Sequence, residues 1–308
     1  MKIFNNKTIL ITGGTGTLGQ QLTRRLLESK VKKIIIYSRD EFKQYHMASE
    51  ITDERVRFFI GDVRDGVRLG RALEGVDFVV HTAALKHVTI CEYNPIEAIH
   101  TNVLGAINVL NQSLDKGVEK VVALSTDKGV NPVNLYGASK LCSDKIFISG
   151  NAYSGLRGTL FSVVRYGNVS ESRGSVIPYF KKLVKSGENV LPVTDERMTR
   201  FHITIDQGID LIFKAFNEME GGEIFVAKIP SYRIIDIVKK MGCTYKKIGI
   251  RPGEKLHEVM ITKEDALNTY DCGDHYLIIN SDYAKPRGRK MNDNFEYRSD
   301  KNKEWVFV

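Results

Sequence analysis

The stretch Thr8-Ile-Leu-Ile-Thr12, followed by Gly13-Gly-Thr-Gly-Thr-Leu-Gly19, decides the fold of this chain. A short apolar strand runs directly into a glycine-rich turn, and residues 18–27 then show the apolar spacing of a helix. Such a turn lets the backbone approach a pyrophosphate at the helix N-terminus, although a tight turn without a ligand is the alternative. We expect a dinucleotide to bind through Gly13, Thr15, Gly16, Thr17, Leu18 and Gly19.

The alternation of strands and helices continues after this unit. Further apolar strands are expected at residues 33–37, 56–60, 76–81, 118–124 and 161–165, with long helices at residues 96–114 and 134–149. Repeated strand–helix alternation predicts an α/β fold, a Rossmann-type doubly wound parallel sheet, for residues 1–168.

The pattern becomes less regular after residue 168. Helices are expected at residues 174–185, 204–219 and 231–241, and strands at residues 190–193, 223–227 and 245–250. We therefore expect residues 169–308 to form mainly a smaller mixed α/β substrate lobe with a C-terminal tail, while residues 200–220 return to the first domain. The polar tail, from about residue 285 to 303, is expected to wrap over the surface, with Trp305 as its anchor.

Composition narrows the class of protein. The 308 residues are 42% hydrophobic, which is ample for a packed core, and their apolar runs are too short to span a bilayer. Met1 runs almost directly into the first strand, so we expect no signal peptide and a cytoplasmic location. The four cysteines are scattered and show no metal-ligand spacing. The net charge of +8 is dispersed, which favours an anionic small-molecule substrate over nucleic acid or a membrane.

Residues at the ends of the next strands complete the expected cofactor site. An arginine after the second strand fits a 2′-phosphate, which favours NADP, although a solvent-facing arginine is the alternative. Asp62 is expected to accept from an adenine amino group or to cap the helix that begins near Asp65. Small residues after the fourth strand leave room for cofactor. The residues concerned are Ser38, Arg39, Lys43, Asp62, Val63, Ala83, Ala84 and Lys86.

The chemistry is expected where the fifth strand ends. Residues 118–124 run into Ser125-Thr-Asp-Lys128, and ligands of open α/β sheets bind at such carboxyl ends. Tyr136 and Lys140 follow, four residues apart on one helical face. A lysine beside a tyrosine favours the phenolate, so that the pair can take a proton from a substrate hydroxyl. A solvated helix face would carry the same spacing.

Two further polar residues lie near these segments. We favour a structural or substrate-edge role for His87 over a role as general base. Asn102 is expected to make a structural contact that orders the helix carrying Tyr136.

Taken together, these segments resemble the extended short-chain dehydrogenases/reductases and, more narrowly, the inverting UDP-N-acetylglucosamine 4,6-dehydratases of the pseudaminic acid pathway. The resemblance covers residues from near 8 to near 260. Its most discriminating element is the Thr-Asp-Lys triplet, since the retaining sugar dehydratases typically have Thr-Asp-Glu and 4-epimerases lack the acid–base pair. The matching stretches begin at Thr12, Tyr37, Ala83, Ser125, Asn134, Arg165, Ser172, Arg197 and Gly249.

The resemblance implies a cytoplasmic, homo-oligomeric lyase that retains NADP and acts on UDP-N-acetylglucosamine without a metal. Tyr136, paired with Lys140, would take the 4-hydroxyl proton, Thr126 would bind the 4-oxygen, Asp127 would be the acid, and Lys128 the base at carbon 5. For this role we expect repulsion by Lys140 and desolvation to depress the pKa of Lys128, although an ionised Asp127 would oppose that change. The alternative for Lys128 is that it stays charged and polarises the 4-keto oxygen. The substrate would be held by Lys86, Asn168, Arg173, Thr199, Arg200, Arg251 and Glu254, although a surface ion pair is the alternative for each arginine.

Other functions remain open at this point. Within enzymes, the rivals are a UDP-sugar 4-epimerase and a dehydratase that also epimerises carbon 3. From another class, the chain could be a catalytically silent cofactor-binding or regulatory protein. The intact Tyr136/Lys140 pair and the intact Thr126-Asp127-Lys128 triplet argue against that reading.

Overall fold

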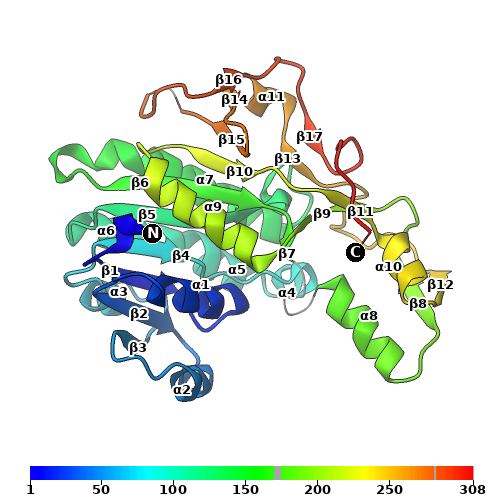
Figure 1. Cartoon of the computed structure of the whole chain (residues 1–308), viewed down its shortest axis with the longest axis horizontal. Coiled ribbons are helices and arrows are strands. Elements are labelled where there is room, and N and C mark those ends of the chain that lie inside the picture. The colour runs from blue at the N-terminus through cyan, green and yellow to red at the C-terminus, as the bar shows by residue number, and fades with distance from the viewer. Residues whose placement is uncertain (170–174, 281, 308) are drawn as a thin grey trace.

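A ten-stranded sheet forms the centre of the computed structural model, which describes residues 1–169, 175–280 and 282–307 (Figure 1). The strand order is β16-β14-β15-β10-β6-β5-β4-β1-β2-β3. The strands are β1 (Thr8–Thr12), β2 (Lys33–Ser38), β3 (Val56–Ile60), β4 (Phe78–His81), β5 (Lys120–Thr126), β6 (Leu160–Tyr166), β10 (Ile224–Ala227), β14 (Thr269–Asp271), β15 (His275–Ile278) and β16 (Arg289–Lys290).

Seven neighbouring strands, from β3 to β10, run parallel, and β15, β14 and β16 extend the sheet antiparallel. All five residues of β1 are buried, as expected for a strand covered on both faces. The order 3-2-1-4-5-6 is that of a doubly wound dinucleotide-binding fold, and it reverses between β1 and β4. The expected sheet is thus confirmed, and ligands are expected outside the carboxyl ends of its central strands.

Helices cover the two faces of this sheet. They are α1 (Thr17–Leu27), α2 (Glu41–Glu50), α3 (Gly66–Ala72), α4 (Val88–Tyr93), α5 (Pro95–Ile99), α6 (Gly105–Asp115), α7 (Leu135–Ser149) and α9 (Ile205–Glu218). The capping box of Thr204 and Gln207 starts α9. The single helix expected over residues 96–114 is instead α5 and α6 joined by a π-helical turn, His100–Leu104. Short 3-10 turns occupy Lys2–Phe4, Asp127–Gly129, Gly150–Tyr153 and Gly155–Arg157.

A smaller lobe with its own core lies at one end of the molecule (Figure 1). It contains α8 (Val176–Lys185), α10 (Ile234–Lys240) and the parallel pair β8 (Val190–Val193) and β12 (Thr244–Lys247). Its core includes Phe180, Leu191 and Ile237. A three-stranded sheet of β7 (Asn168–Val169), β9 (Thr199–Ile203) and β11 (Ser231–Arg233) adjoins it, and β13 (Val259–Ile261) pairs with β17 (Tyr297–Arg298); α11 is Lys263–Ala266.

Three expectations need correction. The boundary at residue 168 does not separate the main sheet from the rest, because β10, β14, β15 and β16 belong to that sheet. The helix expected from residue 231 begins at Ile234, after the strand β11. The tail does more than wrap over the surface: β17 pairs with β13, while Trp305 forms a bridge to Ser231 and lies 5.4 Å from the Arg233 guanidinium.

Candidate active site

The glycine turn after β1 forms a close-packed backbone cradle. Gly13 has φ +66°, and a Cβ there would lie 2.9 Å from the backbone of Ala83, which follows β4. A Cβ on Gly19 would lie 2.4 Å from the carbonyl oxygen of Gly14, so this helix–turn contact also requires glycine. Gly16 is the N-cap of α1, and among the described residues no side chain caps the helix. The first-turn amides are therefore suited to a pyrophosphate, as expected.

Three residues expected at the adenosine end of this cradle lie together. An Arg39 Nη1 nitrogen is 3.6 Å from Asp62 Oδ2, and the Arg39 side chain remains half exposed. Asp62 also pairs with Arg64 at 2.6 Å, and these contacts lower the pKa of Asp62 against the opposing effect of burial. The alternative that Asp62 caps the next helix is wrong, because Asp65 is that cap. Val63, the next residue after Asp62, is buried.

The remaining residues of this group already have protein partners. Ser38 Oγ accepts a hydrogen bond from Gln44 Nε2 at 3.0 Å, and Lys43 Nζ pairs with Asp40 Oδ2 at 2.6 Å. Direct contacts of Ser38 and Lys43 with cofactor stay predictions that require these partners to be exchanged or shared.

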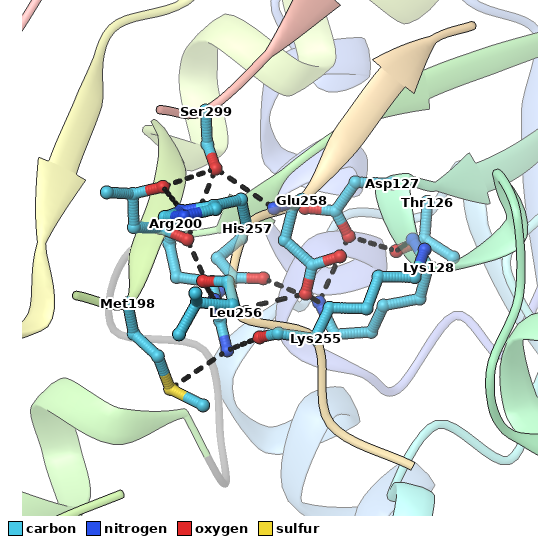
Figure 2. A network of polar contacts seen from close by, with 12 residues as sticks. Thr126, Asp127, Lys128, Met198, Arg200, Lys255, Leu256, His257, Glu258 and Ser299 are labelled. Atoms are coloured by element: carbon cyan, nitrogen blue, oxygen red, sulfur yellow. Dashed lines mark hydrogen bonds and ion pairs between the residues drawn. The ribbon is translucent and has the colours of Figure 1, made fainter. Parts of the chain in front are cut away.

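The expected acid and base lie together at the carboxyl end of β5. Thr126 ends the strand, and Asp127 and Lys128 form the 3-10 turn after it. Lys128 Nζ donates to Asp127 Oδ1 and to Asn168 Oδ1, each at 3.0 Å, and lies 3.3 Å from Glu258 Oε1 (Figure 2). Asp127 is fully buried. The ammonium of Lys128 is thus shared by two carboxylates.

The protonation of this group differs from expectation. Burial alone would lower the pKa of Lys128, but Asp127 and Glu258 raise it above its ordinary value. The expectation that repulsion and desolvation depress this pKa is therefore wrong for this state. Burial raises the pKa of Asp127 against the effect of Lys128, and the charge of Glu258 adds to the rise. Lys128, Arg200 and Lys255 overcome burial and lower the pKa of Glu258.

Helix α7 brings Tyr136 and Lys140 to the same edge. Asn134 caps the helix by accepting from the Gly137 amide at 2.7 Å. Burial raises the pKa of Tyr136 to about 12, opposed by the charge of Lys128 and by a hydrogen bond with Thr126. The cation acting on the phenol in this state is thus Lys128, whereas Lys140 was expected. Burial lowers the pKa of Lys140, and Asp144 opposes that change.

Buried polar contacts order this helix. Asn102 Nδ2 donates to Ser139 Oγ at 2.9 Å, and Ser139 lies between Tyr136 and Lys140, which confirms the expected structural role of Asn102. On the next turn, Asp144 accepts from Ser125 Oγ at 2.6 Å and lies 3.6 Å from Arg165. Because the asparagine sits in the π-helical turn, an irregular helix serves the site here.

Two residues expected to hold substrate are committed to the protein instead. The Thr199 hydroxyl is buried and bonds to His257 Nδ1 at 2.9 Å and Ser299 Oγ at 2.7 Å. Arg200 donates to the carbonyl oxygens of Thr199, Leu256 and Lys255 at 2.7, 3.1 and 3.0 Å (Figure 2). A guanidinium occupied by three carbonyls and a carboxylate is a poor ligand for a diphosphate. We therefore assign both residues to the wall of the site.

The other expected substrate residues lie in the turn at residues 251–254, in the loop directly after β4, or outside the described residues. Arg251 is exposed and lies 3.8 Å from Glu254, and the Gly253 carbonyl of the same turn accepts from Asn134 at 2.7 Å. This turn therefore sits on the N-terminus of α7. Burial and the charge of Lys128 lower the pKa of Lys86. Arg173 lies outside the described residues, and His87, expected to be structural or at the substrate edge, is exposed.

Sequence reasoning missed the second carboxylate of the site. Glu258 is 2% exposed and 130 positions from Lys128 in sequence. Its only signal was the dense charge of residues 251–258. Tyr232, which is buried and hydrogen-bonds Asn168, was also missed. In the described part of the chain, no cluster of three or more His, Cys, Asp or Glu is placed to hold a metal ion. Nor do the described helices include one long and apolar enough to cross a membrane.

A doubly wound sheet, a glycine turn after its first strand, and tyrosine and lysine one turn apart on α7 define an extended short-chain dehydrogenase/reductase. Residues 9–280 match the family model described as polysaccharide biosynthesis protein, and the chain belongs to this family.

Three known proteins show where the chain stands within it. A Campylobacter jejuni protein named UDP-N-acetylglucosamine 4,6-dehydratase (inverting) is 51% identical, covering 99% of this chain and 96% of that relative. A Rickettsia canadensis protein named UDP-glucose 4-epimerase is 42% identical, covering 90% of this chain and 84% of that relative. DesIV, a dTDP-glucose 4,6-dehydratase from Streptomyces venezuelae solved with NAD and TYD bound, has a TM-score of 0.73 and 26% identity over 81% of this chain and 86% of that one.

Proposed function

We infer that the protein is an inverting UDP-N-acetylglucosamine 4,6-dehydratase, a lyase that forms a UDP-2-acetamido-2,6-dideoxy-4-hexulose. The observation that carries this function is the buried Asp127 bonded to Lys128 beside Tyr136. An oxidation at carbon 4 alone needs only the tyrosine, whereas loss of water needs a further acid and base. Close similarity to the inverting dehydratase from Campylobacter jejuni supports the same conclusion.

NADP is the proposed cofactor. The Gly13–Gly19 turn and the uncapped start of α1 fit its pyrophosphate. Arg39, half exposed at the end of β2, provides a partner for a 2′-phosphate. When bound, the nicotinamide accepts hydride from carbon 4 and returns it to carbon 6.

Tyr136 carries out the first proton transfer, from the 4-hydroxyl. Its high pKa means that the phenolate must be stabilised before it can act as base, and Lys128 and Thr126 are the groups that favour this form. We propose that Thr126, which hydrogen-bonds the phenol, binds the 4-oxygen as well. Lys140 lies one turn further along the same helix and is buried.

Asp127 then protonates the departing 6-hydroxyl, and burial favours the protonated carboxyl that this step requires. Lys128 removes the carbon-5 proton, which the 4-keto group acidifies. The ammonium must first release a proton, and a neighbouring carboxylate lies within hydrogen-bond distance to receive it. The competing assignment leaves Lys128 charged, polarising the 4-keto oxygen, with Tyr136 making both transfers; the raised pKa of Lys128 favours that assignment in the resting state.

Most of the residues expected to hold substrate keep that role in this proposal. We propose that Lys86, Asn168, Arg173, Arg251 and Glu254 bind the nucleotide sugar, the arginines at its diphosphate and Glu254 at a ribose or uracil donor. Asn168 directly adjoins the acid–base group, because its amide oxygen accepts from Lys128 at 3.0 Å and the residue hydrogen-bonds Tyr232.

Mass spectrometry of UDP-N-acetylglucosamine after incubation with the protein and catalytic NADP tests this function. A dehydratase removes one water from the sugar without consuming cofactor. A 4-epimerase, the activity named for the Rickettsia canadensis relative, leaves the mass unchanged. Unchanged mass with isomerised sugar would therefore replace our proposal by the epimerase.

The proposal also covers the cellular location, the pathway and the oligomeric state of the enzyme. We place it in the cytoplasm, in a pathway of the pseudaminic acid type, as a homo-oligomer. Exposed apolar side chains on α4 and α5, including Tyr93 at 88% and Ile96 at 66% exposure, support association between copies.

A further inference from the structure

The ammonium nitrogen of Lys128 lies within 3.3 Å of three acceptor oxygens. Asp127 Oδ1 is 3.0 Å from Nζ and Glu258 Oε1 is 3.3 Å away (Figure 2). Asn168 Oδ1 is also 3.0 Å from Nζ. An ammonium has three donors and no lone pair. Lys128 can therefore act as a base only after one partner takes a proton, and only the two carboxylates can do so.

Glu258 is held more rigidly than a surface carboxylate. It precedes β13, and its backbone amide donates to Ser299 Oγ at 2.9 Å while its carbonyl accepts from the Ser299 amide at 2.9 Å. Arg200 Nε lies 3.7 Å from Oε1 on the other side. Glu258 Oε2 and Asp127 Oδ2 are both buried without a hydrogen-bond partner among the described residues. Each of the two carboxylates that contact Lys128 thus keeps one oxygen without a hydrogen-bond partner among the described residues.

We propose that Glu258 is a positioning residue of the dehydration. Its carboxylate holds Lys128 next to Asp127 and sets whether Asp127 or Lys128 carries the proton at each step. This proposal rests on the proposed dehydratase function. It gives a buried ion pair a chemical purpose, since a purely structural pair of this kind contributes little net stability over apolar packing.

The surrounding charges make the two carboxylates unequal. Lys128 from the 3-10 turn, Arg200 from β9 and Lys255 from the loop before β13 face Glu258 and favour its ionised form. Asp127 faces Lys128 and the negative Glu258, and Tyr136 and Tyr232 also adjoin this group. Carboxylates driven apart in this way can serve one as acid and the other as fixed charge. The three groups titrate together, so their macroscopic pKa values belong to the cluster.

The test is the pH profile of kcat for Glu258→Gln. Removing the negative charge lowers the pKa of both Asp127 and Lys128. The alkaline limb, where the acid loses its proton, and the acidic limb, where the base gains one, both move to lower pH. Because Glu258 Oε1 lies only 3.3 Å from Lys128 Nζ, a displacement of at least about one pH unit is expected. Glu223→Gln, a buried, ion-paired carboxylate at the start of β10, is the matched control and should keep the parental profile.

Transient NADPH absorbance during single turnover separates this inference from the proposed function. Glu258→Gln should retain the absorbance rise of the first oxidation and show slower elimination with displaced limbs, whereas Glu258→Asp, which keeps the charge, should keep the position of both limbs. A Glu258→Gln profile that falls uniformly without moving, in a protein that still oxidises substrate, would overturn the positioning role. If the parent protein itself shows no oxidation of UDP-N-acetylglucosamine, the proposed function fails instead.

Discussion

Replacing Asp127 by asparagine should separate oxidation from elimination. The substitution keeps the shape of the side chain but removes its proton-donating carboxyl. At an effective dielectric constant of about 20, the charge pair between Lys128 and Asp127, 3.0 Å apart, is of the order of 5 kcal/mol. Lys128 nevertheless stays paired with Glu258 at 3.3 Å, so the fold should survive. We expect the loss of water to slow by about 10²–10⁴-fold, the usual contribution of a general acid.

Stopped-flow absorbance of NADPH, followed by product analysis, measures both steps in one experiment. In Asp127→Asn the absorbance should rise as in the parent and then persist, because the oxidised sugar cannot lose its 6-hydroxyl. Glu223→Gln neutralises a buried carboxylate just before the amino end of β10, away from the carboxyl ends of the strands where the site lies, and it should behave as the parent. Parental product formation by Asp127→Asn, or loss of the absorbance rise itself, would refute the assignment of Asp127 as the acid of elimination alone.

Three other substitutions test separate parts of the account. Tyr136→Phe should abolish the NADPH transient, because no other described group is proposed to take the 4-hydroxyl proton; a persisting transient would assign that step elsewhere. Arg39→Asp should weaken NADP binding, measured by equilibrium dialysis, by about 1.5–3 kcal/mol, the value of a charge-assisted contact; unchanged affinity would show that Arg39 does not bind the 2′-phosphate. Ser299→Ala should lower the free energy of urea unfolding by about 1–3 kcal/mol, because it leaves the buried Glu258 amide without its partner; Ser49→Ala, at an exposed hydroxyl, is the control, and equal effects would contradict this reasoning.

The sequence predicted the strands of the main sheet well where a run of apolar residues marked each strand. β1 and β3 have the expected bounds, whereas the fifth strand, expected at residues 118–124, begins and ends two residues later. The short strands β9, β13 and β17 were missed, since two to five residues carry too little periodicity and their pairing joins residues far apart. The same limit explains the misplaced domain boundary: β15 and β14 join the sheet through antiparallel pairing that no local pattern announces.

The candidate site shows the same division. Thr126, Asp127 and Lys128 are adjacent in sequence, so their grouping at a strand end was predictable. Residue type alone could not show that Arg200 would bind three carbonyl oxygens, because that depends on how residues 255–258 pass over β9. Likewise, the pKa of Lys128 is raised by Asp127 and also by Glu258, whose position is set by pairing between β13 and the tail. The sequence showed the first carboxylate but not the second, so the expected depression of this pKa was wrong.

Proton NMR of UDP-N-acetylglucosamine incubated with the protein in deuterated water tests the central claim most directly. If an acid and a base act at carbons 6 and 5, the product is a 4-keto, 6-deoxy sugar with inverted carbon 5 that carries deuterium at that carbon. The hydrogen that leaves carbon 4 should reappear at carbon 6 without dilution by solvent. A sugar that keeps its 6-hydroxyl and its original carbon-5 hydrogen, with only carbon 4 altered, would contradict the account.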